Sequence, residues 1–76
     1  MSNAPEIRAL LTPKDFKPFA IHLTDGSHYD ITNHDMMRVS RNAVDIGVNR
    51  DETGIAERFV RCAIIHITRI EELQAA

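Results

Sequence analysis

Apolar and polar residues alternate most clearly between Phe16 and Ile31, and this alternation predicts a β-hairpin. The apolar side chains that stand at every second position on the two strands are Phe19, Ile21, Leu23, Tyr29 and Ile31. A period of two is typical of a strand with one buried face. The Asp25-Gly26 pair between the two runs is a strong turn signal, so we expect the chain to reverse there.

The length of this turn decides which residues face each other. A two-residue loop at Asp25-Gly26 would place Ile21 opposite the polar Asp30. A three-residue loop, which begins one residue earlier, places Ile21 opposite Tyr29 and gathers the apolar residues of both strands on one face. Because a slip of one residue turns a strand over, the pattern predicts the three-residue loop. Such a loop ends in a left-handed residue, and Gly26 adopts that conformation without steric cost.

Residues 4–11, before the hairpin, are predicted to form a short helix. Asn3 is a suitable N-cap, and Pro5 fits the first turn, where a missing N–H costs no hydrogen bond. A stripe of apolar residues at helical spacing follows, made of Ile7, Leu10 and Leu11. The Thr12-Pro13 pair ends the helix, because the residue before a proline is pushed out of the helical conformation.

A second hairpin is predicted over residues 36–48. A two-residue loop at Arg41-Asn42 places Arg38 opposite Asp45, so that a cation faces an anion. The same register also places apolar residues of the two strands opposite one another. Asn42 suits such a loop, since it is one of the few residues other than glycine that tolerate positive φ.

The chain beyond this hairpin contains a loop and one long apolar stretch. Residues 49–54 are charged and aperiodic, and they are expected to form a mobile loop. The stretch from Arg58 to Ile70 is typical of a strand but long for a single one, so a bend is expected between Arg61 and Ile64. About five short antiparallel strands are therefore expected within residues 17–70. A strongly bent, five-stranded barrel would bury one face of these strands and limit open edges.

Length and composition place the chain among small globular proteins. Its 76 residues make a single domain, 1–76, which would bury only about 60% of its unfolded surface, so self-association would add stability. The net charge of −2 comes from 9 basic and 11 acidic residues and gives no global positive field to attract nucleic acid. Cys62 is the single cysteine, so no disulfide forms within the chain, and a reducing, cytoplasmic setting is expected. We find no signal peptide and no membrane-spanning run in the sequence.

The order of the predicted elements resembles that of the bacterial Sm-like RNA chaperone family. The resemblance rests on the leading helix, on Pro18–Gly26 with its Asp-Gly turn, and on the late segment Arg61–Ile70. It implies an all-β, Sm-like or SH3-like barrel that assembles into a ring and binds RNA. The Lys-His pair that this family uses for RNA would fall near Arg61-Cys62, where only the positive charge is kept. Phe16–Gly26 also resembles a Phe-x-Pro-Phe-x-Ile-x-Leu-x-Asp-Gly pattern of small bacterial proteins of unknown function.

Arginines are the candidate nucleic-acid contacts. A phosphate-binding rim could be lined by Arg38, Arg41, Arg58 and Arg61, with Arg69 further along the chain. In a ring, Arg61 would repeat around one rim and create a local positive belt. The alternative is a mixed, solvated surface, because acidic residues are interspersed among the arginines. Aromatic side chains for base stacking are scarce, since the phenylalanines fall mostly on core-facing positions.

Two histidines form the candidate metal site. The hairpin register places His22 opposite His28, with Asp30 nearby on the same polar face. Two imidazoles and a carboxylate could bind Zn²⁺ or a similar ion, and the alternative is a pair of solvated histidines. His34-Asp35 follows a strand and is either a loop cap or a catalytic pair. Cys62 is expected to be a buried, inert thiol, although the neighbouring arginine could lower its pKa.

Catalytic motifs are missing from the sequence. It contains no glycine-rich phosphate loop, nucleophile elbow, Cys-x-x-Cys or His-Glu-x-x-His. A subunit of this size also has little room for a closed pocket. We therefore expect a homo-oligomeric binding module that is not an enzyme and has no cofactor. Two hypotheses remain, an RNA-binding module and a protein-interaction module without nucleic acid, and a one-sided positive patch would favour the first.

Overall fold

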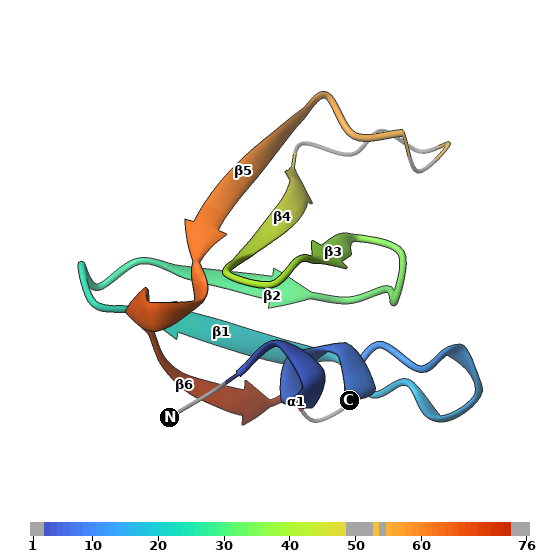
Figure 1. The fold of residues 1–76 in the computed structure, drawn as a ribbon. Helices are drawn as coiled ribbons and strands as arrows, with labels where there is room; N and C mark the ends of the chain where they lie inside the picture. Colours follow the sequence, from blue (N-terminus) through green and yellow to red (C-terminus); the bar gives the residue numbers. More distant parts are fainter. Residues whose placement is uncertain (1–2, 49–52, 54, 74–76) are drawn as a thin grey trace.

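The computed structural model describes residues 3–48, 53 and 55–73, and Figure 1 shows how they are arranged. Six strands follow a short helix and a 3₁₀ turn, and a second 3₁₀ turn precedes the last strand. The bounds are α1 Ala4–Ala9, η1 Pro13–Asp15, β1 Phe19–Leu23, β2 His28–Ile31, β3 Met37–Val39, β4 Ala43–Val48, β5 Arg58–Ala63, η2 Ile64–His66 and β6 Ile67–Glu72. No helix in these ranges is both long enough and apolar enough to span a membrane.

The strands form two antiparallel sheets of three strands each. β1 lies between β2 and β6 in one sheet, and β4 lies between β3 and β5 in the other. The all-β class is confirmed, and neither sheet closes on itself. Six strands lie within the described residues, where about five were expected. Both parts of the long late stretch pair separately, β5 with β4 and β6 with β1, so each counts as a strand.

The first hairpin has the predicted register. Ile21 faces Tyr29 across β1 and β2. The backbone N–H of Leu23 donates to the carbonyl oxygen of Ser27 at 2.9 Å and closes the three-residue loop. Gly26 ends this loop with a φ of 90°, in the left-handed region that glycine adopts most easily. The register follows from the need to keep the apolar residues of both strands on the core side.

Replacing Gly26 with alanine is expected to destabilise the protein by about 1–2 kcal/mol through backbone strain. An added Cβ would meet no atom within 4 Å, so crowding contributes nothing to this cost. Urea denaturation of Gly26→Ala and of Lys14→Ala, an exposed position outside the hairpin, would measure the difference. An unchanged midpoint for Gly26→Ala would contradict the left-handed turn.

The second hairpin also has the predicted register, with Arg38 opposite Asp45. The Ser40 N–H donates to the carbonyl oxygen of Ala43 at 2.9 Å across the two-residue loop. The predicted mobile loop at 49–54 lies outside the described residues, except for Thr53.

The bend in the late stretch begins at the C-terminal end of the predicted interval, Arg61 to Ile64. β5 continues to Ala63, and the chain turns at η2, Ile64–His66. β6 then extends to Glu72, two residues beyond the stretch that is predicted to be strand. β6 reaches this far because it pairs along β1 as far as Phe19, a contact that local sequence does not reveal.

The helix begins as predicted and ends earlier. The Asn3 side chain accepts a hydrogen bond from the Glu6 N–H at 2.9 Å and caps α1. The helix ends at Ala9, whose carbonyl oxygen accepts a hydrogen bond from the Thr12 hydroxyl at 3.0 Å. Only Ile7 of the predicted apolar stripe is fully buried.

One hydrophobic core is shared by α1 and both sheets. The largest fully buried side chains are Ile7, Phe19, Ile21, Ile31, Val44 and Ile46. They come from the helix, from β1 and β2, and from β4, so the core joins the two sheets. The alternating polar positions of the same strands are left on the outside, where the candidate sites lie.

Candidate nucleic-acid interface

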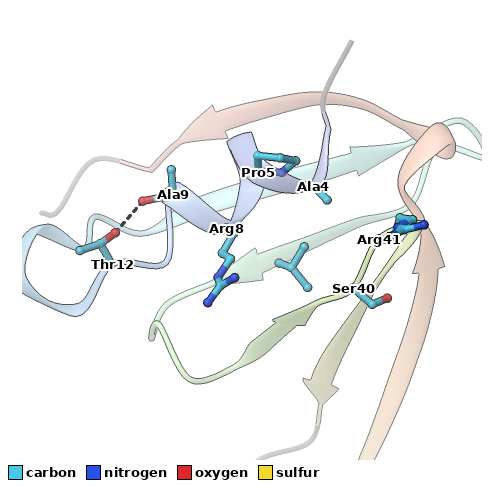
Figure 2. A pocket seen from close by; sticks show the side chains of 8 residues that line it. Ala4, Pro5, Arg8, Ala9, Thr12, Ser40 and Arg41 are labelled. Carbon is cyan, nitrogen blue, oxygen red and sulfur yellow. Dashed lines mark hydrogen bonds between the residues drawn. The ribbon is translucent and has the colours of Figure 1, made fainter.

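An open groove of about 550 Å³ lies between α1 and the β3–β4 turn, and Figure 2 shows its lining. Arg8 reaches into it from the helix, and Arg41 borders it from the turn. Ala4, Pro5, Ala9, Thr12, Val39 and Ser40 complete the lining. The groove therefore combines an apolar floor with two guanidinium groups.

A second open groove, of about 600 Å³, continues the first along β3. Both are lined by Arg8, Thr12 and Val39, and the second adds Arg38 and His34. We call the two together the arginine groove, defined by Arg8, Arg38 and Arg41. The described residues that line it include no aspartate or glutamate. Three positive charges therefore border one surface of a chain whose net charge is −2, although Arg38 also faces Asp45 across β3 and β4.

Local structure explains why these side chains point outward. Arg8 follows Ile7, the buried residue of α1, and therefore lies on a different side of the helix. Arg38 alternates with the buried Met37 along β3, so it faces away from the core. Arg41 lies in the exposed loop between β3 and β4. Because α1 packs beside β3, residues 30 positions apart in the chain border one surface.

Sequence reasoning identified Arg38 and Arg41 but missed Arg8. The apolar stripe of the helix predicts which side packs on the core, but it does not indicate what the arginine beside that stripe contacts. The signal was present, since a short helix with one buried residue must expose its charged positions. What the sequence did not show was that α1 packs beside β3.

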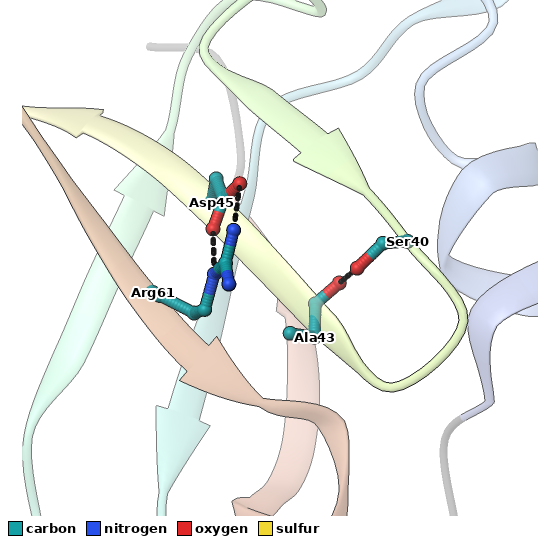
Figure 3. Close-up of polar contacts among 4 residues, drawn as sticks. All are labelled: Ser40, Ala43, Asp45 and Arg61. Atoms are coloured by element: carbon teal, nitrogen blue, oxygen red, sulfur yellow. Dashed lines mark hydrogen bonds and ion pairs between the residues drawn. The ribbon is translucent and has the colours of Figure 1, made fainter.

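The structure does not bring Arg58 and Arg61 to the arginine groove. Both lie on β5, which is separated from β3 by β4. Figure 3 shows that Arg61 is paired with Asp45 of β4. Its Nε donates to Oδ1 at 2.8 Å and its Nη2 donates to Oδ2 at 3.3 Å. This pairing corresponds to the alternative that we expected for an arginine within a mixed surface.

The pairing between Arg61 and Asp45 shifts both groups toward their charged forms. The hydrogen bonds from Arg61 are the main cause that lowers the pKa of Asp45 below its ordinary value. The same contact raises the pKa of Arg61. Two nitrogens of the Arg61 guanidinium are therefore engaged by a carboxylate, whose negative charge makes this arginine less attractive to a phosphate group.

A dependence of stability on pH follows from the lowered pKa of Asp45. Because the pKa is lower in the folded state, the stabilisation is present above about pH 4 and is lost as pH falls through the folded value. We expect Asp45→Asn to be less stable than the unmodified protein at neutral pH and to lose less stability on acidification. Urea denaturation of both proteins at several pH values would measure this, and parallel pH profiles would contradict it.

The candidate metal pair is brought together as predicted. The rings of His22 and His28 stack at 5.5 Å between centroids, with 25° between their planes. The His22 Nε2 lies 3.1 Å from Oε1 of Glu71 on β6. Within the described ranges, no three side chains of His, Cys, Asp or Glu are placed to bind one metal ion. The two-histidine metal site therefore stays a prediction.

The other candidate residues, Asp25, Cys62 and His34, make contacts that stabilise the fold. Asp25 accepts hydrogen bonds from the Ser27 hydroxyl at 2.6 Å and from the Ser27 N–H at 2.9 Å, which lowers its pKa and stabilises the turn. Cys62 is buried, and burial is the main cause that raises the pKa of its thiol, so it is a weak nucleophile. The His34 ring packs edge-on against Phe16 at 6.4 Å.

Phe59 is the exception to the expectation that the phenylalanines fall mostly on core-facing positions. Phe59 of β5 is 62% exposed, whereas Phe19 of β1 is buried. Its position opposite Gly47 places it on the outer face of the sheet, beside the paired Asp45 and Arg61. The sequence alone does not determine which side chains of β5 face the core, because apolar residues occur at neighbouring positions along this strand.

Comparisons with known proteins identified no relative. A scan against protein-family models, a search of curated proteins and a search of solved structures each gave no significant match.

Proposed function

We propose that this chain is a small, homo-oligomeric β-barrel module of the Sm-like type and that it binds RNA. The observation that supports RNA most strongly is the arginine groove. Three arginines from α1, β3 and the β3–β4 loop border one surface, and no acidic residue is among the described residues that line it. Phosphate groups of a nucleic-acid backbone are the ligands that such a surface attracts most strongly.

The connections between the two sheets support the barrel. β2 leads directly to β3, and β5 leads through η2 to β6. The strands therefore follow a circular order, in which β6 returns to pair with β1. Within the described residues, only β2 with β3 and β5 with β6 are neighbours in this order that are connected along the chain without being paired in one sheet. A small barrel needs only modest bending of these sheets toward each other to close.

The volume of the groove also supports a ligand. Small-molecule and nucleotide-sized sites commonly measure about 300–1,000 Å³ and combine apolar walls with a few placed polar groups. The first part of the arginine groove, at about 550 Å³, lies within this range and has that composition. Its apolar floor would contact sugar or base while the guanidinium groups contact phosphate.

The proposal is tested by titrating the purified protein with fluorescent polyuridine at about 50 mM salt and again at higher salt. Binding that weakens steeply with salt is expected. The native mass and the ratio of nucleic-acid to protein absorbance of the fresh preparation would report assembly and RNA carried over from the cell. No binding at low salt would overturn the RNA proposal.

The second candidate is a protein-interaction module without nucleic acid. It is favoured by the exposed apolar side chains of the β4–β5–η2 region, namely Ile55, Phe59 and Ile65. Exposed apolar side chains near one edge of a sheet are typical of surfaces that contact another chain. An absence of RNA binding together with a native mass above that of one chain would support this candidate.

A further inference from the structure

Among the described residues, no strand pairs with one edge of β5. β5 lies at the end of the sheet order β3-β4-β5, so only its β4 side is occupied within the described part of the chain. The N–H of Ile64 donates to the carbonyl oxygen of Asn42 at 2.9 Å, continuing the ladder between these strands. In an antiparallel ladder the bonded positions alternate, so residues 58, 60 and 62 direct their backbone groups to β4. The backbone groups of Phe59 and Arg61 are then directed to the free edge.

The edge of β5 combines charged side chains with an exposed aromatic ring. Proteins usually protect such an edge with charged side chains, proline or a bulge, because an open edge is a template for another strand, and Arg58 and Arg61 are charged. β5 also carries Phe59, which is 62% exposed, on its outer face. The alternation of the strand places Arg61 on that same face. Glu57 is exposed and immediately precedes β5, where its N–H donates to the carbonyl oxygen of Val48 at 3.2 Å and holds it beside the sheet. The face therefore offers an acid, an aromatic ring and a base in sequence.

This order of side chains is complementary to itself in an antiparallel pairing. We infer that a second copy of this chain adds to the sheet through β5, antiparallel, with Phe59 opposite the partner's Phe59. The two-fold axis then places Glu57 opposite the partner's Arg61 and repeats the same pair on the other side. Two cross-strand ion pairs would flank one aromatic pair, and each kind of pair stabilises a sheet. This interface specifies the homo-oligomer of the proposed function and rests on that part of it.

Two observations favour this register over one centred on Arg61. A dyad at Arg61 would place two guanidinium groups opposite each other, which is destabilising. The C-terminal half of β5 also borders a pocket of about 400 Å³ whose other side is formed by the β1–β2 hairpin. Figure 1 shows that the N-terminal half of β5 extends away from that hairpin, so the edge around Phe59 is the more accessible.

The ion pair between Arg61 and Asp45 is compatible with a second ion pair between Arg61 and the partner's Glu57. The Arg61 side chain remains 75% exposed while it is paired with Asp45. Its guanidinium presents five N–H donors, of which Asp45 accepts from two nitrogens. The remaining donors are sufficient for the partner's Glu57.

The test is a pair of charge-reversal variants, Glu57→Arg and Arg61→Glu, the second made with Asp45→Asn to avoid a new repulsion within the chain. Each variant alone would place like charges across the dyad and is expected to run as a monomer of 8.6 kDa in sedimentation. Mixed together, they would restore both ion pairs and are expected to form a heterodimer of twice that mass. Circular dichroism of each variant would establish that it is folded.

Two controls make the outcome decisive. Asp45→Asn alone and Arg69→Glu, an exposed charge reversal on β6, are expected to remain dimeric. Variants that stay associated when alone, or that stay monomeric when mixed, would overturn the interface. A larger oligomer that Glu57→Arg leaves intact would overturn the interface but keep the homo-oligomer. A monomeric unmodified protein at micromolar concentration would overturn both, while the polyuridine titration would still report on RNA separately.

Discussion

Removing two arginines from the arginine groove is expected to weaken polyuridine binding by at least about tenfold, which corresponds to about 1.4 kcal/mol. The variant is Arg8→Ala combined with Arg41→Ala. Each substitution would remove a charge-assisted hydrogen bond to phosphate, and such bonds are the strongest of a surface site. The dependence of affinity on salt should also flatten, by about 0.7 in logarithmic slope for each phosphate of a single strand that is no longer neutralised. A fluorescence titration at several salt concentrations measures both effects.

A matched control distinguishes the effect of the arginine groove from the effect of lowering the net positive charge of the protein. Arg58→Ala combined with Arg69→Ala removes the same net charge from β5 and β6, away from the groove, and is expected to change affinity by much less. Arg61→Ala distinguishes the groove from the rim expected from the Sm-like resemblance. Because Arg61 is already paired with Asp45, we expect only a small decrease in affinity. Equal weakening by both double variants would show that binding is non-specific, and a dominant effect of Arg61→Ala would restore the rim as the contact.

Replacing Phe19 with alanine is expected to cost about 3–5 kcal/mol of folding stability. Phe19 is 1% exposed and is among the largest fully buried side chains. It lies on β1, the central strand of its sheet, with Ile31 on one side and Glu72 on the other. Its ring also lies 6.1 Å from that of Phe16, so the substitution removes an aromatic contact as well as creating a cavity. A small domain has a total stability of about 5–15 kcal/mol, so much of the protein would be unfolded at physiological temperature.

The same substitution at Phe59 provides the control for this prediction. Phe59→Ala removes an identical group from a side chain that is 62% exposed, so its loss in thermal stability should be far smaller. Thermal unfolding followed by circular dichroism, at a concentration low enough to keep the protein monomeric, compares the two variants directly. A similar loss for both would mean that Phe59 is packed in the folded chain and that the burial difference is wrong.

Local sequence determined the two hairpins. In each, the alternation of side chains and the turn residues leave one register that keeps apolar residues on one face. The pairing of Ile21 with Tyr29 and that of Arg38 with Asp45 could therefore be predicted. The N-terminal cap at Asn3 was predictable for the same reason, since its partner lies three residues away. These features depend on neighbours in the chain, and a turn of two or three residues allows few alternatives.

Contacts between distant residues required the tertiary structure. The extension of β6 to Glu72 depends on its pairing with β1, where Glu72 lies opposite Phe19, and no local pattern specifies so distant a partner. The exposure of Phe59 depends on which face of β5 meets the core, and neighbouring apolar residues allow either parity. The candidate site depends on the packing of α1 beside β3, which brings Arg8 to Arg41. Side-chain pattern specifies which face of an element is buried, but the partner of that face is chosen by packing across the whole chain.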